Sequence, residues 1–283
     1  MVQTKSIQGY KLEGTPVVDI PVPIVGNLIN DELGKVFLAK LNEKFRGNNQ
    51  IAYIHEVNEN NPIQFSNIPR NLYANQVIRE ETGNTHVQSP EEMVQYWDKL
   101  PEKSFTYADS SAVSVFPREG PNETLRKRVL DILGKDKTEI PLLVLGLGVD
   151  PLDNPDSFTF TETPYLKVIE APYLEKDQKV KYDPKTQTIV PSDDDTGVEI
   201  WTPSDQSGLR RAYRLRDVVL GFWGVNLFDS VSDGRVPFFQ NPQGSAENLD
   251  IRIEELEAER DKQRAEVDSR YKKALNFLKT GKL

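Results

Sequence analysis

The chain has 283 residues, of which 37% are hydrophobic and 28% charged, and its formal net charge is −9. This composition excludes wholesale disorder and indicates one large globular domain or two smaller ones. The acidic balance argues against general nucleic-acid binding, and the absence of cysteine excludes disulfides, thiolate metal sites and cysteine nucleophiles. The first residues lack a signal-peptide pattern and no apolar run is long enough to cross a membrane, so we expect a cytoplasmic protein or a phage particle component.

The first half of residues 1–150 alternates segments typical of strands and helices. Val17–Val25 is rich in β-branched residues but interrupted by prolines, which predicts an edge strand. Glu32–Phe45 carries an apolar stripe behind a capping residue, Asn30 or Asp31, and predicts a helix. Gln50–Val57 predicts a strand, and the long polar stretch that follows it is expected to begin with a turn.

Four further elements are expected before residue 150. The SPEE sequence at Ser89–Glu92 is a capping box, so a helix should begin there and run to about Leu100. Tyr107–Phe116 predicts a strand, and Asn122–Leu133 has the apolar spacing of a helix. Pro141–Val149 is the most apolar run of the chain, and we expect it to form one buried strand.

The remainder of the chain changes character twice. Residues 150–200 hold four turn-rich clusters between short β-type runs, which predicts an irregular strand-and-loop region. Residues 245–279 are highly charged and contain neither glycine nor proline, which predicts an exposed helix. The apolar residues of this helix follow a weak heptad spacing, so both a coiled coil between copies and a helix packed on its own body remain open.

These elements predict an α+β fold with three parts. We expect an α/β-type N-terminal region of unknown role at residues 1–150, a ligand-binding domain at residues 151–245 and a charged helix at residues 246–283.

Motifs for catalysis or metal binding are weak. Gly146-Leu-Gly148 follows a strand but lacks the third glycine and the helix start of a dinucleotide site, so a turn is favoured. The acidic loops at 150–156 and 193–195 lack EF-hand spacing and are interpreted as solvated turns. His55 and His86 form no metal-binding pair, and no nucleophile elbow is present. We therefore expect no enzyme, cofactor or metal, with a carboxylate hydrolase using Asp193–Asp195 as a minor alternative.

The most informative segment is residues 207–239, SGLRRAYRLRDVVLGFWGVNLFDSVSDGRVPFF. A strand-like first half is followed by aromatic residues among glycine, asparagine, aspartate and serine. That composition is typical of recognition surfaces, although the same aromatic residues also suit an ordinary core. Four arginines open the segment, and we expect Arg214 and Arg216 to pair with the acidic body rather than with nucleic acid.

This segment resembles the variable region of proteins diversified by diversity-generating retroelements. The invariant frame of that pattern falls on Gly208, Leu209, Arg210, Tyr213, Arg214, Arg216, Leu220, Leu227, Ser230, Gly234, Arg235 and Val236. Val218 and Phe222 depart from the frame, which has leucine and alanine there. The resemblance implies that the positions between the frame are diversified and contact the ligand, namely Leu215, Asp217, Val219, Gly221, Trp223, Gly224, Val225, Asn226, Phe228, Asp229, Val231, Ser232 and Asp233.

Such variable proteins have C-type lectin or formylglycine-generating-enzyme-like folds, so the resemblance implies a C-type-lectin-like domain at residues 151–245. The copper-binding cysteines of the catalytic members are absent, which favours a binding module for a protein ligand. No nucleic acid or membrane is expected as a partner, and assembly through the C-terminal helix would add avidity. The alternative is a structural component of a phage or injection particle, such as a baseplate, fibre or capsid-associated protein.

Overall fold

The computed structural model describes residues 6–7, 10–11, 23–96, 107–154, 157–186, 188–192, 196–215, 219–230 and 232–241. The chain divides into two compact units, of which the larger comprises Pro23–Asn241 and the other Met1–Val22 with Pro242–Leu283. In the smaller unit, strands β1 (Ser6–Ile7) and β2 (Tyr10–Lys11) pair antiparallel. The charged helix and the coiled coil expected at 246–283 lie outside the described residues.

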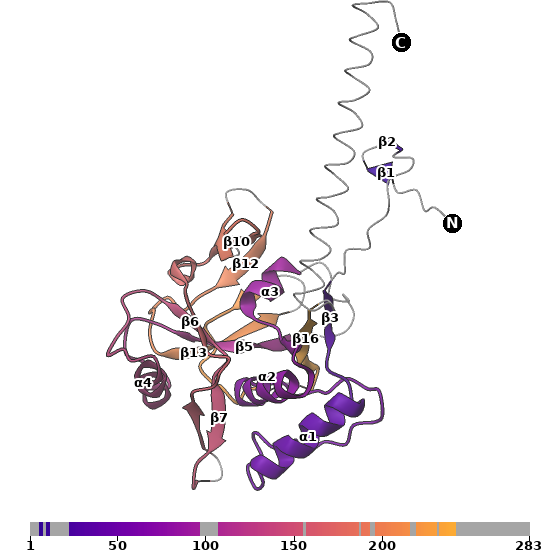
Figure 1. Cartoon of the computed structure of the whole chain (residues 1–283). Helices are drawn as coiled ribbons and strands as arrows, with labels where there is room; N and C mark the ends of the chain where they lie inside the picture. The colour runs from indigo at the N-terminus through magenta and orange to yellow at the C-terminus, as the bar shows by residue number, and fades with distance from the viewer. Residues whose placement is uncertain are drawn as a thin grey trace, which may run out of the picture. The chain divides into compact units, whose positions relative to one another are not determined.

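The larger unit is mixed α+β and is built around a curled sheet (Figure 1). Over the described residues, the strands of this sheet follow the order β11 (Thr188–Pro191), β10 (Gln178–Asp183), β12 (Val198–Trp201), β14 (Val219–Gly221), β13 (Leu209–Leu215), β5 (Tyr107–Val115), β6 (Leu142–Leu145) and β9 (Lys167–Glu170). A ninth strand, β15 (Gly234–Arg235), pairs with the start of β5. The pairs β12–β14 and β5–β15 are parallel and the other pairs are antiparallel.

The centre of this sheet joins segments that are distant in the sequence. Strand β5 pairs along its length with β13, from Leu209 opposite Val115 to Leu215 opposite Tyr107, with an irregularity between Arg211 and Tyr213. Strands β5 and β6 precede residue 150, and the other strands of the sheet follow it. The boundary that we expected at residue 150 therefore separates strands that belong to one sheet, and the residues before it do not form a separate α/β region.

Two smaller sheets complete the strands of the larger unit. Strand β16 (Pro237–Gln240) lies between β3 (Ile24–Asn27) and β4 (Thr85–Val87), with antiparallel pairing on both sides. Strands β7 (Gly148–Pro151) and β8 (Phe158–Thr161) form a two-stranded antiparallel pair. The edge strand expected at Val17–Val25 corresponds to β3, which begins at Ile24 and lies at the edge of its sheet; residues 17–22 lie outside the described residues.

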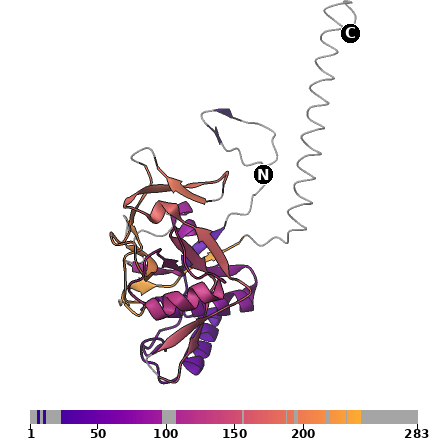
Figure 2. The same ribbon diagram turned by 90° about the vertical axis from the view of Figure 1, so that its left-hand side faces the viewer.

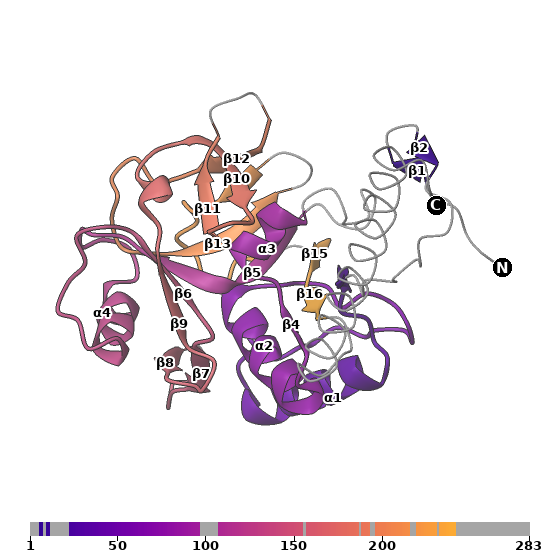
Figure 3. The same ribbon diagram turned by 45° about the horizontal axis from the view of Figure 1, so that its top comes forward.

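The side chains of β5 alternate between two apolar cores, one on each face of the sheet. Val113 and Val115 face the core that contains α1 (Glu32–Lys44) and α2 (Ile68–Thr82). Ala112 faces the core beneath α3 (Pro90–Gln95), which lies beside β10 (Figure 3). The remaining helices among the described residues are α4 (Glu123–Ile132), which packs against β8 and β13 and is the magenta helix that faces the viewer in Figure 2, and a 3-10 helix, η2 (Pro172–Leu174).

Helix-capping signals in the sequence are confirmed. The Asp31 carboxylate accepts a hydrogen bond from the Gly34 amide, and α1 follows. At α3, Ser89 and Glu92 form the predicted capping box, although the helix ends at Gln95 rather than near Leu100. The predicted strand at Tyr107–Phe116 and the strand-and-loop region after residue 150 are also confirmed.

The prediction of a strand at Gln50–Val57 is wrong, because side chains close in the sequence accept hydrogen bonds from its backbone amides. The Asn48 side-chain oxygen accepts hydrogen bonds from the amides of Gln50 and Ile51, both at 3.0 Å, and the Asn42 side-chain oxygen accepts one from the Tyr53 amide at 2.6 Å. These bonds replace the pairing that a strand would require.

The single strand expected at Pro141–Val149 is two strands, β6 and β7, separated by Gly146. This glycine has a φ of +69°, and a Cβ there would lie 2.0 Å from the carbonyl oxygen of Tyr165. Both features require glycine at position 146, where the chain turns. The GLG sequence therefore forms the turn between β6 and β7.

Helix α2 was not predicted, since only a turn was expected in the polar stretch that contains it. Most of its residues are buried on every side, including Arg70, Asn71 and Asn75. Arg70 donates to the carbonyls of Ile51 (2.7 Å), Ala52 (2.9 Å) and Phe65 (2.6 Å). A helix that is buried all round has no polar face, so its sequence shows no amphipathic stripe.

Candidate binding surface

The segment between β14 and β15, described at residues 222–230 and 232–233, forms a partly exposed loop that we call the binding loop. Its side chains Trp223 and Val225 are 48% and 47% exposed, and Trp201, at the end of β12, is 38% exposed. Trp201 is paired with Gly221, and its carbonyl accepts a hydrogen bond from the Phe222 amide at 2.8 Å. Three of the eight large hydrophobic side chains that are exposed in the described part of the chain therefore lie on this loop or at the strand end paired with its start, and we call Trp201, Trp223 and Val225 the apolar patch.

Side chains from the scaffold hold the backbone of the binding loop. Arg210 donates to the Trp223 carbonyl at 2.8 Å, and Asn122, at the start of α4, donates to the Val225 carbonyl at 2.7 Å. The guanidinium of Arg211 donates to the carbonyls of Asn226 and Asp229, each at 3.0 Å. The loop carbonyls are thus anchored on the sheet while Trp223 and Val225 face solvent.

Arg211 lies in a buried site below the loop. Its guanidinium carbon is 4.8 Å from the ring centroid of Tyr107 and 4.9 Å from that of Tyr213, so the cation lies against two aromatic faces. Its Nε is 3.2 Å from Oδ1 of the buried Asp109, and its Nη1 is 3.1 Å from Oδ2 of Asp229, whose side chain is 61% exposed. One arginine therefore connects a carboxylate in the core with a carboxylate on the loop.

Asp109 has no contact with solvent, and this burial raises its pKa well above the usual range. The hydroxyl of Ser66 donates to Asp109 Oδ2 at 3.2 Å and opposes the rise, while the negative charge of Asp229 adds to it. The Tyr107 hydroxyl donates to Oδ1 at 2.7 Å. Burial likewise lowers the pKa of Arg211, and Asp229 opposes that change. Because Asp109 is 0% exposed, its carboxyl group contacts only side chains of the protein interior.

Arg210 forms the second ion pair at the apolar patch. Its Nη2 lies 2.8 Å and 3.0 Å from the two carboxylate oxygens of Asp205, in the turn that follows Trp201. A hydrogen bond from the Ser207 hydroxyl lowers the pKa of Asp205, and the charge of Arg210 contributes to the same effect. Arg210 and Arg211 thus make ion pairs with aspartates, and the pairing that we expected of Arg214 and Arg216 stays a prediction. Arg214 is buried, and residue 216 lies outside the described part.

The thirteen predicted ligand-contact positions divide by exposure. Exposed on the surface are Trp223, Val225, Asn226, Asp229 and Ser232. Half-buried are Leu215, Gly224, Phe228 and Asp233. Val219 and Gly221 are buried, whereas Asp217 and Val231 lie outside the described residues.

Two of the predicted contact positions have no room for a side chain. A Cβ at Gly221 would lie 2.5 Å from Cζ of Tyr213, and a Cβ at Gly224 would lie 2.6 Å from Cγ of Arg211. Phe228 packs edge-on against Phe158, with ring centroids 5.2 Å apart. These positions face the scaffold, because Gly221 lies in β14 opposite Tyr213, Gly224 lies against Arg211 and Phe228 packs on Phe158.

Sequence reasoning did not identify Trp201 or Asn122 as part of this surface. Trp201 reaches it by pairing of β12 with β14, and Asn122 reaches it across 103 positions of the chain. Asn122 has a φ of +60°, a conformation that asparagine tolerates better than most residues. A local sequence pattern cannot predict such long-range contacts.

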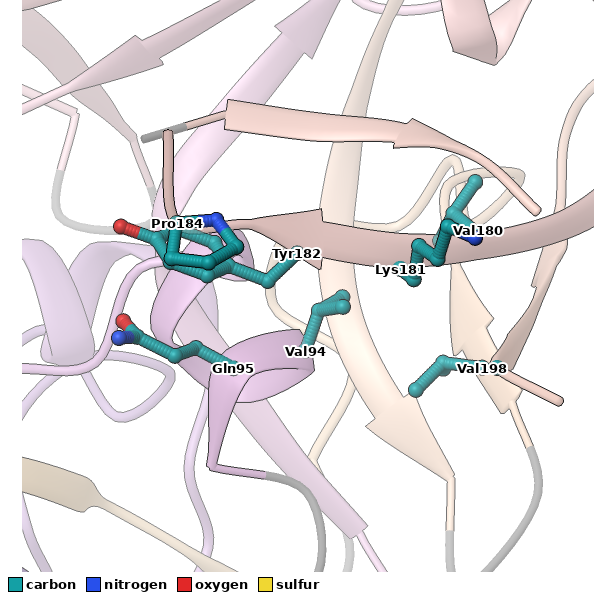
Figure 4. Close-up of a pocket in the computed structure, with 8 residues that line it drawn as sticks. Val94, Gln95, Val180, Lys181, Tyr182, Pro184 and Val198 are labelled. Atoms are coloured by element: carbon teal, nitrogen blue, oxygen red, sulfur yellow. The ribbon is translucent and has the colours of Figure 1, made fainter. Parts of the chain in front are cut away.

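A separate shallow pocket of about 490 Å³ lies between the end of α3 and strands β10 and β12 (Figure 4). It is lined by Val94, Gln95, Val180, Lys181, Tyr182, Pro184, Gly197 and Val198. The side chains of Gln95 and Tyr182 lie toward one end of it, and Val94 and Val198 toward the other. None of the lining residues is a histidine or a carboxylate, and the titratable side chains among them are Lys181 and Tyr182.

The two histidines have structural contacts. Nε2 of His86 lies 2.6 Å from Oε1 of Glu92, and the ring of His55 stacks on Phe65 at 3.8 Å. Within the described ranges, no group of three or more histidine, aspartate or glutamate side chains is placed to hold a metal ion. Asp193–Asp195 are not among the described residues.

A scan of the described helices finds none that combines the length and the apolar character needed to cross a membrane.

Comparison of the chain with protein-family models, with curated proteins and with solved structures finds no match.

Proposed function

We propose that this chain is a non-enzymatic binding protein that recognises a protein ligand through the apolar patch. The observation that carries the proposal is the combination of three exposed apolar side chains with a loop backbone anchored from below. Exposed tryptophan is the residue type most often found at the energetic centre of protein interfaces. A loop already held in one conformation also loses little entropy when it binds.

The surroundings of the apolar patch match the anatomy of an interface. Polar side chains border it: Glu199 accepts a hydrogen bond from the Trp201 indole at 2.9 Å, and Asn226, Asp229 and Ser232 are exposed on the binding loop. A small apolar centre with a polar rim is typical of specific, reversible contacts between proteins. Trp201, Trp223 and Val225 would supply most of the affinity, and the polar rim would select the ligand.

The resemblance to retroelement-diversified proteins extends this proposal to the origin of the surface and to a C-type-lectin-like fold. On this hypothesis, diversification is restricted to the exposed positions of the binding loop, since Gly221 and Gly224 have no space for other side chains. Sequencing the gene and its flanks in sibling isolates tests it. We expect a near-copy of codons 207–239, differing mainly at adenines.

Identical sequences at 215–233 in all siblings, with no near-copy, would remove the diversification hypothesis. The alternative of a particle component would then gain support from a stable assembly in size-exclusion chromatography. Binding through the apolar patch is tested independently of both.

The binding test selects ligands from a random dodecapeptide library on the immobilised full-length chain. We expect enriched peptides whose affinity falls about 10- to 100-fold for the Trp201→Ala/Trp223→Ala double variant, the loss typical of interface hot spots. The matched control is Leu152→Ala/Val168→Ala, which removes two exposed apolar side chains, 49% and 39% exposed, elsewhere on the same unit. Peptides that bind both double variants equally well would contradict the proposal.

A further inference from the structure

We infer that Arg211 is a positioning residue that sets the conformation of the binding loop and thereby the presentation of Trp223 and Val225. The inference rests on the proposed function, because it names the residue that keeps that surface ready for its ligand. Arg211 is only 2% exposed, so it acts through the loop and not by touching the ligand.

The contacts of Arg211 span the middle of the loop. Its backbone amide donates to the Gly224 carbonyl at 3.1 Å, and its Nη1 donates to the carbonyls of Asn226 and Asp229. Between those two carbonyls the chain makes a turn, in which the Asp229 amide donates to the Asn226 carbonyl at 3.2 Å and the Phe228 amide to the Asn226 side chain at 3.1 Å. One side chain therefore ties both ends of the turn to strand β13.

Arg211 itself has little freedom to move. The rings of Tyr107 and Tyr213 contact its guanidinium, and the Asp109 carboxylate lies beside Nε. Tyr107 and Asp109 belong to β5, which is the central partner of β13. The paired strands thus hold the Arg211 guanidinium in place, and the guanidinium in turn holds the loop backbone.

Lysine cannot reproduce these contacts. Its ammonium is a compact charge on a flexible stem, whereas the planar guanidinium lies against two rings and beside Asp109 while its Nη1 meets the loop acceptors. The Arg211→Lys variant keeps a cation near Asp109 and Asp229 but has no planar group to pack against the two rings while its charge bonds to the loop carbonyls. The substitution should therefore loosen the loop selectively.

The test is amide hydrogen exchange of the full-length Arg211→Lys protein. We expect exchange at Phe228 and Asp229 to accelerate about 10- to 100-fold, since hydrogen bonds from a charged donor are among the stronger ones in proteins. Amides of the β5–β13 pairing should change much less. The matched control is Arg79→Lys on α2, which removes a partly buried guanidinium that lies 5.3 Å from the Tyr165 ring and bonds to Asn75 at 3.3 Å.

Acceleration of equal size across β5, β13 and the loop would overturn the inference, because Arg211 would then stabilise the fold as a whole. Unchanged exchange at Phe228 and Asp229 would also overturn it. Should the lysine variant fail to fold, Asp229→Asn provides the second measurement. It removes the exposed carboxylate and leaves the buried pair intact, and we expect a several-fold acceleration at the same amides.

A binding readout separates this inference from the proposed function. Library-selected peptides should bind Arg211→Lys about tenfold more weakly than the parent protein, although they do not reach Arg211. The exchange experiment needs no ligand. If loop exchange accelerates in Arg211→Lys but the library yields no peptides, the positioning role is supported and the proposed function is refuted. If peptides are selected but loop exchange is unchanged, the proposed function is supported and the positioning role is refuted.

Discussion

Replacing Gly221 by alanine tests whether β14 supports the loop as described. The added methyl would lie 2.5 Å from Cζ of Tyr213 and 2.8 Å from its Cε2 and hydroxyl, against a comfortable carbon–carbon separation of about 3.5–4 Å. Gly221 is not among the residues with positive φ, so the cost is steric alone. The ring of Tyr213 has nowhere to move, because the Tyr107 ring lies 5.5 Å from it and Arg211 lies against its face. Overpacking of this kind costs about 1–3 kcal/mol of unfolding free energy.

Urea denaturation measures the effect of Gly221→Ala directly. With a denaturant slope of about 2–3 kcal/mol/M, the midpoint should fall by about 0.3–1.5 M. Gly47→Ala is the control, because that glycine has no atom within 4 Å of its Cβ position and its cost comes only from a φ of +88°. Combining Gly221→Ala with Tyr213→Leu should give a loss smaller than the sum of the single losses. A midpoint for Gly221→Ala equal to that of the parent would refute the steric argument.

Three further predictions concern stability. Ser89→Ala removes the capping box of α3 and should cost about 1 kcal/mol in thermal unfolding, whereas Ser89→Asn should retain most of the stability. Asn48→Ala leaves two amides near the buried Ile51 without their acceptor and should cost about 1–3 kcal/mol; a smaller effect than that of an exposed control such as Asn49→Ala would contradict the role of Asn48. The pKa of Asp205 is lowered in the folded state, so this group stabilises the protein at pH values above its unfolded-state pKa. That stabilisation is lost as the pH falls through the folded-state pKa. Acid unfolding followed by circular dichroism should therefore be less steep below about pH 4 for Asp205→Asn than for the parent.

Local signals in the sequence were sufficient for elements that begin or end with a recognisable residue. Helices α1 and α3 were found because Asp31 and Ser89 cap them, and β5 because its residues alternate loosely as in a strand. Elements defined by distant partners were missed or misjudged. Helix α2 is buried around its whole circumference, and residues 50–57 are held by the side chains of Asn48 and Asn42.

The candidate site shows the same division. The concentration of aromatic and small residues after β14 indicated a surface, and Trp223, Val225, Asn226 and Asp229 are exposed there. The alternating pattern could not show that Gly221 and Gly224 face the side chains of β13, because that depends on how two strands pair. Trp201 joins the surface for the same reason.

The position of β16 has a consequence for how the protein is made. Residues 237–240 form the middle strand of a sheet whose outer strands, β3 and β4, lie about 150 to 200 positions earlier in the chain. During synthesis, β3 and β4 emerge from the ribosome long before the strand that joins them, and β5 likewise waits for β13. The larger unit cannot close until about residue 240 is available, so its unpaired strand edges need protection throughout translation.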